Sequence, residues 1–434
     1  MAARTLSSYP EIEIELFERH DRLGGLHQSV ELNGLMFDIG AFEFSPDHEL
    51  ILAFPEILKH YLTVQQVNRV VAPTGHLSPY PFSIASYLQS YGRLDLLLAL
   101  ASGLVGRLLY RQPHSLDAWV RFYIGNRFYR KTGLQAYIER LYGNATKQVD
   151  IEFARVRLAQ IEALGSLAQV ARQYLTPALR AQFAPPQQVV PPSLGSLSGG
   201  GYPSLVRPRQ GFSYVYDGMI KPLLQAAGVA VTTSCQVGSI RRDPQGFRIE
   251  TDRGVTICDR VISTLPLQTS ARLCGLATGQ AYLKYQPMVS LFYSFRGTIH
   301  SDATILYNFT QTGSWKRVVL FSRYYGQHQG QDYFTVEVPD GAATPIAGLT
   351  TAFEQQITAL NLMTGTFQYL GHATTSEAYP LYRVDTMAEL RQTQAALRAF
   401  GIDLVGRQAE FSHIGSSETA RRARQLATAL GGVR

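Results

Sequence analysis

The chain has 434 residues, of which 45% are hydrophobic and 17% charged, which excludes an intrinsically disordered protein and allows two globular domains. The formal charge of +7 is spread without a block of like charge, so no nucleic-acid surface is indicated. The three cysteines lack C-x-x-C spacing, which argues against a zinc site and favours a reducing, cytoplasmic location. Arginine outnumbers lysine, so small anionic ligands remain plausible partners.

The N-terminal region predicts two strands separated by a glycine turn. The apolar run 12–17 is a short strand that ends at Glu18, whose carboxylate is placed to accept hydrogen bonds from ribose hydroxyls. Gly24 and Gly25 form a turn without side chains that lets the backbone approach a ligand. A second strand follows and turns at Gly40-Ala41. This order is typical of the adenosine-to-flavin half of a dinucleotide-binding fold.

The glycine-rich phosphate turn of such a fold, G-x-G-x-x-G, does not precede Glu18. The residues after Met1 resemble only the end of the helix that should follow this turn. We therefore expect the first strand and the phosphate turn to be missing, either because the start codon is placed too late or because the protein is defective. A chain without them should bind its cofactor weakly or not at all.

The region from 45 to about 179 is predicted to be mainly helical, with apolar residues at three- and four-residue spacing in 94–110 and 153–174. The longest apolar run, 96–105, is too short to cross a membrane. We expect it to be a buried helix; the alternative is peripheral contact with a membrane surface. The proline- and glycine-rich stretch 185–203 predicts a linker or a mobile loop.

The next region predicts a return to the first domain. It contains a helix at 214–227, a strand at 229–237, a hairpin at 247–257 and a buried parallel strand at 260–264. That last strand ends in a turn at Thr264, Leu265 and Pro266, where an open α/β sheet would meet its ligand.

The C-terminal third predicts an antiparallel sheet and a final helix. Aromatic and polar residues alternate in 289–295, 304–309 and 317–325, a pattern that favours strands in the wall of a second domain. The helix at 417–430 would begin after Gly415 with free backbone N–H groups that suit an anion.

In this order the blocks resemble the group of FAD-containing enzymes that includes amine oxidases, protoporphyrinogen oxidases and UDP-galactopyranose mutases. The resemblance implies FAD as cofactor, with contacts from Glu18, Gly24, Gly25, Leu26, Gly40, Ala41, Val237, Thr264, Leu265, Pro266, Gly406, Arg407 and Ser416. It implies an α/β fold: an interrupted Rossmann-like FAD-binding domain that lacks its first strand, with an inserted substrate domain of helices and antiparallel sheet. The predicted FAD-binding domain comprises 1–45, 204–280 and 376–434, and the substrate domain 46–203 and 281–375.

Details of the resemblance favour the mutase branch. Gly24-Gly25-Leu26 replaces the Gly-Gly-Arg of amine oxidases, and Tyr80-Pro81-Phe82 is similar to a substrate loop of the mutases. The resemblance implies that Tyr80, Arg155, Arg317 and Tyr379 contact substrate and that the arginines hold the pyrophosphate of a nucleotide sugar. From the residues alone, each arginine could equally form a surface ion pair, and each tyrosine could be a packed aromatic.

Two departures keep other functions open. Ala41-Phe42 replaces a glycine-histidine pair that lies beside the flavin in the mutases, and Ser416 replaces an asparagine near the flavin. The alternatives are an oxidoreductase of the amine oxidase or protoporphyrinogen oxidase type and a truncated chain with weak or no FAD binding. No catalytic residue and no metal ligand is predicted, and the oligomeric state is not indicated.

Overall fold

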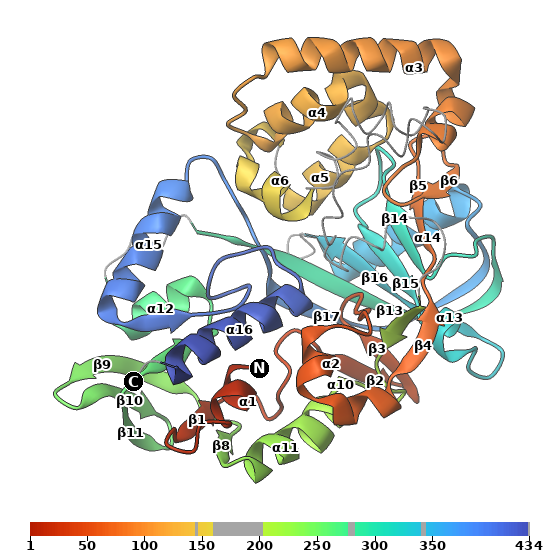
Figure 1. The fold of residues 1–434 in the computed structure, drawn as a ribbon. Coiled ribbons are helices and arrows are strands. Elements are labelled where there is room, and N and C mark those ends of the chain that lie inside the picture. The colour runs from red at the N-terminus through yellow and green to blue at the C-terminus, as the bar shows by residue number, and fades with distance from the viewer. Residues whose placement is uncertain (144–145, 159–202, 277–282, 340–343, 433–434) are drawn as a thin grey trace, which may run out of the picture.

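The computed structural model describes residues 1–143, 146–158, 203–276, 283–339 and 344–432. Its largest element is a seven-stranded sheet (Figure 1). In spatial order the strands are β17 (Met363–Pro380), β13 (Tyr285–Ile299), β16 (Asp332–Pro339), β15 (Arg317–Leu320), β14 (Ile305–Asn308), β5 (Asn68–Val71) and β6 (Leu77–Pro79). The sheet is mixed, because β14 and β5 pair in parallel while the other neighbours are antiparallel.

The central strands of the sheet are buried because other elements cover both of its faces. Every residue of β16 is buried. Helix α14 (Ile346–Ala359) places Leu349, Phe353 and Ile357 at four-residue spacing in the core cluster on one face. Strand β3 (Leu35–Asp38) lies on the other face, where Phe37 packs 5.1 Å from the ring of Phe292.

A second group of elements surrounds the two chain ends (Figure 1). Strands β1 (Ile14–Phe17) and β8 (Val229–Thr232) pair in parallel, as do β12 (Val261–Ser263) and β18 (Ile402–Leu404). The other strands here are β2 (Ser29–Leu32), which pairs with β3, and the antiparallel set β9 (Val237–Asp243), β10 (Gly246–Thr251) and β11 (Gly254–Cys258). The helices are α1 (Ala2–Leu6), α10 (Phe212–Val215), the π-turn η4 (Tyr216–Ile220), α11 (Lys221–Ala226), α12 (Leu267–Leu273), α15 (Met387–Phe400) and α16 (Ser416–Gly431).

The mixed α/β fold is confirmed, and most predicted elements of this group are present. The predicted strand 229–237 is too long, because Ser234 adopts a φ of +50° and turns the chain between β8 and β9. The predicted strand 317–325 also ends early. After Leu320 the chain leaves the sheet and forms the short helix α13 (Ser322–Tyr325), which Gly326 terminates with a φ of +81°.

The predicted helical layer is present but contains strands. Its helices are α2 (Glu49–Ala53), η1 (Pro55–His60), α3 (Ile84–Leu109), α4 (Leu116–Lys131), α5 (Leu134–Tyr142), η2 (Thr146–Gln148) and α6 (Ile151–Arg157). Between η1 and α3 the chain forms β4 (Leu62–Gln65), β5 and β6, so the expectation of a mainly helical region was wrong there. Strand β4 pairs with β7 (Pro203–Val206), and β5 joins the large sheet because its neighbour β14 offers a buried apolar edge. Most of the predicted loop 185–203 lies outside the described residues.

The expectation that the apolar run 96–105 is buried was also wrong. Five of its large apolar side chains are exposed on α3, which lies at the outer edge of the molecule (Figure 1), among them Leu97 at 62% and Leu104 at 55% exposure. The periodicity was correct, but the apolar stripe faces outward. Among the described residues, no helix is both long enough and apolar enough to cross a bilayer.

Candidate functional site

The end of β1 places the first predicted cofactor residue. The backbone N–H of Glu18 donates to the carbonyl of Thr232 (2.9 Å), and its own carbonyl accepts from Cys235 N–H (2.9 Å), so the ends of β1 and β8 are held together. Cys235 lies two residues before Val237, the first residue of β9. One carboxylate oxygen of Glu18 accepts from the backbone N–H of His20 (2.8 Å). The local fold therefore brings Glu18 and Val237 to one end of the β1–β8 pair.

The glycine turn after β1 is packed on its inner side and open on its outer side. A Cβ at Gly24, which has a φ of +118°, would lie 2.8 Å from the carbonyl of His27 and 2.9 Å from the ring of Tyr216. A Cβ at Gly25 would meet no atom within 4 Å. Leu26 follows, half-buried. The backbone at Gly25 is therefore exposed, and the approach of a ligand to it stays a prediction.

The C-terminal blocks meet the turn after β12. Val405 N–H donates to Ser263 (3.1 Å), and Leu267 N–H donates to Gln408 (3.1 Å), so the turn Thr264-Leu265-Pro266 lies beside Gly406 and Arg407. Gly406 has a φ of +105°. The guanidinium of Arg407 donates to the carbonyl of Ile414 (2.9 Å). Two blocks that are far apart in the sequence therefore form one edge.

The N-terminal region around His48 also meets the start of the C-terminal helix α16. The Nε2 of His48 lies 2.9 Å from the hydroxyl of Ser416, the first residue of α16, whose N-cap Gly415 provides no side-chain cap. Burial, followed by the nearby His48 and the charge of Arg407, lowers the pKa of His27 to about 3. The neutral imidazole of His27 therefore lies within electrostatic range of Arg407.

The end of β3 contacts the large sheet directly. The hydroxyl of Thr335 donates to the carbonyl of Asp38 (3.0 Å), and the hydroxyl of Ser290 donates to the carbonyl of Ile39 (2.6 Å). As a result, a Cβ at Gly40 would lie 3.6 Å from a carboxylate oxygen of Glu337. Gly40 and the half-buried Ala41 thus stand beside a charged group of β16.

Glu337 is the centre of a buried ionic cluster. Its carboxylate accepts hydrogen bonds from Arg317 Nε (2.6 Å) and Lys316 Nζ (3.1 Å). The side chains are 1%, 15% and 5% exposed, respectively. Burial opposes ionisation of Glu337, but the charges of Arg317 and Lys316 outweigh it and lower its pKa. The trio holds two cations and one anion, so it has an excess of one positive charge.

Tyr379 completes the cluster and is unusually acidic. Its hydroxyl accepts a hydrogen bond from Lys316 Nζ (2.9 Å), and the guanidinium of Arg407 lies 5.3 Å from its ring. Burial alone would raise its pKa, but Lys316, Arg317 and Arg407 stabilise the phenolate and lower the pKa to about 8. The ring of His413 lies 4.6 Å away.

Other tyrosines line the same interior. The ring of Tyr80 lies 4.3 Å from that of Tyr307, and Tyr137 stacks on Phe309 at 4.6 Å. Burial and then the neighbouring Tyr80 and Tyr307 raise the pKa of Tyr137 well above its usual value, and Arg317 and Tyr379 lie close enough to affect it as well. Tyr80, Arg317 and Tyr379, which were predicted as substrate residues, are therefore brought together.

A buried carboxyl group lies beside this cluster. Glu43 accepts a hydrogen bond from the hydroxyl of Tyr324 (2.5 Å) and another from the amide of Gln66. Burial raises the pKa of Glu43 to about 7, although the hydrogen bond from Tyr324 and the charge of Arg317 oppose the rise. It is the second group here that titrates near neutral pH.

The sequence did not single out Lys316, Glu337 or Glu43 as functional. The available signals were two adjacent cations at the start of a buried strand and an acidic residue between two valines in β16. Arg155 lies on α6, whose Phe153 is 5.4 Å from the ring of His413, but the side chain of Arg155 lies outside the described residues.

Comparisons with known proteins identify the family of the chain and proteins of similar fold. The sequence profile of the family "Flavin containing amine oxidoreductase" matches residues 1–353. The structure is similar to a reduced UDP-galactopyranose mutase, with a TM-score of 0.75 and 18% identity, covering 100% of this chain and 91% of that one. It is also similar to a "Putative protoporphyrinogen oxidase" from Exiguobacterium sp. 255-15 (TM-score 0.70, 14% identity, 99% and 96% covered). A variant of putrescine oxidase gives a TM-score of 0.59 at 11% identity, with 99% and 95% covered. No curated protein matched the sequence.

Proposed function

The chain belongs to the family of flavin-containing amine oxidoreductases, and on this basis we propose that it is an FAD-dependent enzyme that acts on an anionic substrate, with a nucleotide sugar as the best candidate. The observation that supports this proposal is the excess of positive charge inside the tyrosine-lined cluster. Lys316 and Arg317 share one ionised carboxylate, Glu337, and a third cation, Arg407, lies 5.3 Å from the ring of Tyr379. Guanidinium groups bind phosphate oxygens in two parallel hydrogen bonds, and a buried site strengthens that attraction.

FAD is the cofactor of this family, and the described residues fit it. The space outside Gly25 is open, and the start of α16 has no side-chain cap. The charge of Arg407 acts on His27, two residues after Gly25, and its guanidinium donates to Ile414, two residues before Ser416. In our proposal Glu18 would hold the ribose, the Gly24–Leu26 turn and the Gly406–Arg407 block would approach the flavin, and backbone N–H groups would face its charged parts. When bound, FAD supplies either a hydride acceptor or, in its reduced form, a nucleophilic nitrogen.

The protein's own contribution would be charge stabilisation and proton transfer. Arg317 would orient the phosphate groups of the substrate, and its pairing with Glu337 fixes the direction of the guanidinium. Tyr379 and Glu43 have pKa values of about 8 and about 7, so each can exchange a proton near neutral pH. We assign to them the proton movements at substrate hydroxyl groups.

A second candidate is hydride removal from a neutral, apolar substrate. The close pair Tyr80 and Tyr307 favours a flat or apolar ligand. An amine substrate is disfavoured, because its ammonium group would meet the cations Lys316 and Arg317, and the carboxylate of Glu337 is already paired with both of them.

The two candidates differ in their redox requirements. We expect the chain loaded with FAD to convert a UDP-sugar only after the flavin has been reduced, without consuming oxygen. Oxygen consumption and bleaching of the flavin on mixing with substrate would support the oxidoreductase instead.

Binding tests the role of Arg317 directly. Titration calorimetry with uridine diphosphate should show at least about tenfold weaker binding for Arg317→Ala, because a charged hydrogen bond to phosphate is lost. Arg317→Lys keeps the charge and should be affected less. Arg323→Ala removes an exposed arginine from α13 and serves as the control. Equal binding by the Arg317→Ala and Arg323→Ala variants would refute the assignment.

A further inference from the structure

Helix α3 has an apolar face that is turned to solvent. The helix bends at Gly92, which has a φ of +79°, and continues to Leu109. After the bend, eight large apolar side chains are between 50% and 80% exposed: Leu94, Leu97, Leu98, Leu100, Leu104, Val105, Leu108 and Leu109. They recur at three- and four-residue spacing and therefore form one continuous stripe. Soluble monomers rarely expose so large an apolar patch without a binding role.

The opposite face of α3 is made of small residues. A Cβ at Gly106 would lie 2.0 Å from the carbonyl of Arg121, and a Cβ at Gly125 of α4 would lie 2.5 Å from the backbone nitrogen of Gly103. The two helices touch through their backbones at these points, and Ala99 is only 2% exposed. The helix cannot rotate to bury its leucines, because no larger side chain fits against α4.

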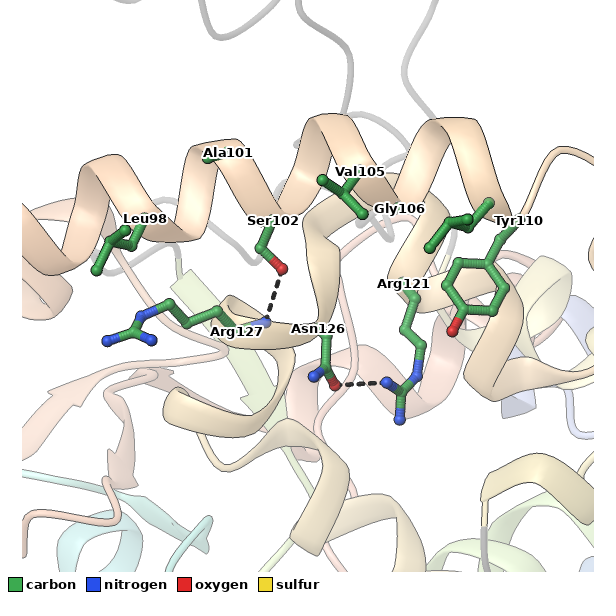
Figure 2. Close-up of a pocket in the computed structure, with 10 residues that line it drawn as sticks. Leu98, Ala101, Ser102, Val105, Gly106, Tyr110, Arg121, Asn126 and Arg127 are labelled. Carbon is green, nitrogen blue, oxygen red and sulfur yellow. Dashed lines mark hydrogen bonds between the residues drawn. The ribbon is translucent and has the colours of Figure 1, made fainter.

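The hydroxyl of Ser102, in the middle of the apolar stretch of α3, also points inward. Figure 2 shows Ser102 directed from α3 toward α4, where its hydroxyl accepts a hydrogen bond from the backbone of Arg127 (3.2 Å). A hollow of about 520 Å³ lies between the two helices. Several apolar residues of α3 line it, together with Arg121 and Asn126 of α4. The outer face thus remains without polar groups over its central turns.

The charges at the two ends of this stripe have one sign. Asp95 is the single acidic residue in 93–111, and its carboxylate is turned inward, where it accepts hydrogen bonds from Tyr87 (2.5 Å) and from Arg127 Nε (3.1 Å). Arg93 and Arg111 are exposed, one at each end. A leucine stripe flanked by exposed arginines is complementary to a surface of hydrocarbon below a layer of phosphate groups.

We propose that the outer face of 93–111 lies in the plane of an anionic phospholipid bilayer, with the leucines among the acyl chains and Arg93 and Arg111 at the lipid phosphates. The segment 93–109 is about 25 Å long as a helix, which suits a helix lying along the surface. A second copy of the chain is a poorer partner. If two such stripes packed face to face, the arginines of both copies would lie along the same apolar contact, and 93–111 has no exposed acidic residue to pair with them.

Co-sedimentation of the purified full chain with vesicles tests this surface. One set of vesicles contains phosphatidylcholine alone and the other contains one part in four of phosphatidylglycerol. We expect binding to the second set to exceed binding to the first. The double variant Leu104→Glu/Leu108→Glu should lower binding at least about tenfold, because it removes two apolar side chains from the bilayer and adds two negative charges.

The control is Leu52→Glu on α2, an equally exposed leucine at 61%, which should bind vesicles like the wild type. Since all three leucines are exposed, the thermal midpoint of both variants should stay unchanged. Absence of binding to both vesicles, equal binding to both, or equal loss in the Leu52→Glu control would overturn the proposal. A dimer that dissociates in the double variant, without vesicle binding by the wild type, would assign the stripe to a second copy.

Discussion

The ammonium group of Lys316 donates a 2.9 Å hydrogen bond to the hydroxyl of Tyr379 and also lies 4.6 Å from the centre of its ring. The cation therefore favours the phenolate over the neutral phenol, and it holds both residues at the edge of the proposed substrate site. The arrangement makes the protonation state of Tyr379 sensitive to pH near neutrality.

Lys316→Met should return the pKa of Tyr379 from about 8 toward its ordinary value of 10. An ultraviolet difference titration should show one tyrosine ionising near pH 8 in the wild type and none there in Lys316→Met. Tyr379→Phe identifies the signal, and its persistence in that variant would contradict the assignment. Because the pKa is lowered on folding, ionisation of Tyr379 adds stability as pH rises from 8 to 10, and this contribution is absent below pH 8.

Glu43 should show the opposite dependence. Burial raises its pKa from 4.5 to about 7, so the folded chain retains a proton that the unfolded chain releases. The contribution of Glu43 to the free energy of unfolding is fully present below pH 4.5 and is lost as pH rises through 7. Glu43→Gln removes this titration, so the free energy of unfolding of the variant relative to wild type should increase by about 1–3 kcal/mol between pH 4.5 and pH 8. A pH-independent difference in urea unfolding would show that Glu43 does not titrate in this range.

Glu337→Gln should destabilise the fold strongly. The substitution leaves Arg317 and Lys316 buried without their counterion, which typically costs about 3–5 kcal/mol. Asp385→Asn breaks an ion pair with Arg383. The side chain of Asp385 is 64% exposed, so the substitution should lower the free energy of unfolding by at most about 1 kcal/mol. Chemical unfolding of the two variants measures both values. If the two variants lose the same free energy of unfolding, the ionic cluster is more hydrated than its burial indicates.

Gly25→Ala should weaken FAD binding more than Gly34→Ala does, although the two substitutions should destabilise the fold to a similar degree. Gly25 and Gly34 both have a left-handed φ, +58° and +75°, and a Cβ at either position would meet no atom within 4 Å. Each alanine should therefore cost a similar 1 kcal/mol or so in strain. In fluorescence titrations with FAD we expect at least about tenfold weaker binding for Gly25→Ala alone. If Gly34→Ala weakens binding equally, the Gly24–Leu26 turn does not face the cofactor.

The sequence by itself determined the cofactor class and most of the element order. A strand ending in Glu18, the pair Gly24-Gly25 and the buried strand before Thr264 are local patterns, because each depends on hydrophobic periodicity and on the backbone freedom of glycine. The structure contains the two predicted strands and the glycine turn. The roles of these residues in binding FAD remain predictions.

Only the tertiary structure decided which side chains meet and which surface is covered. Glu43, Glu337 and Tyr379 are separated by up to several hundred residues, and their pKa values depend on burial and on nearby charges such as Lys316, which no local pattern contains. The leucines of α3 also show what a local sequence pattern cannot determine. Periodicity determines that they share one face of a helix, but whether that face is buried depends on what packs against it, and here the small residues occupy the contact with α4.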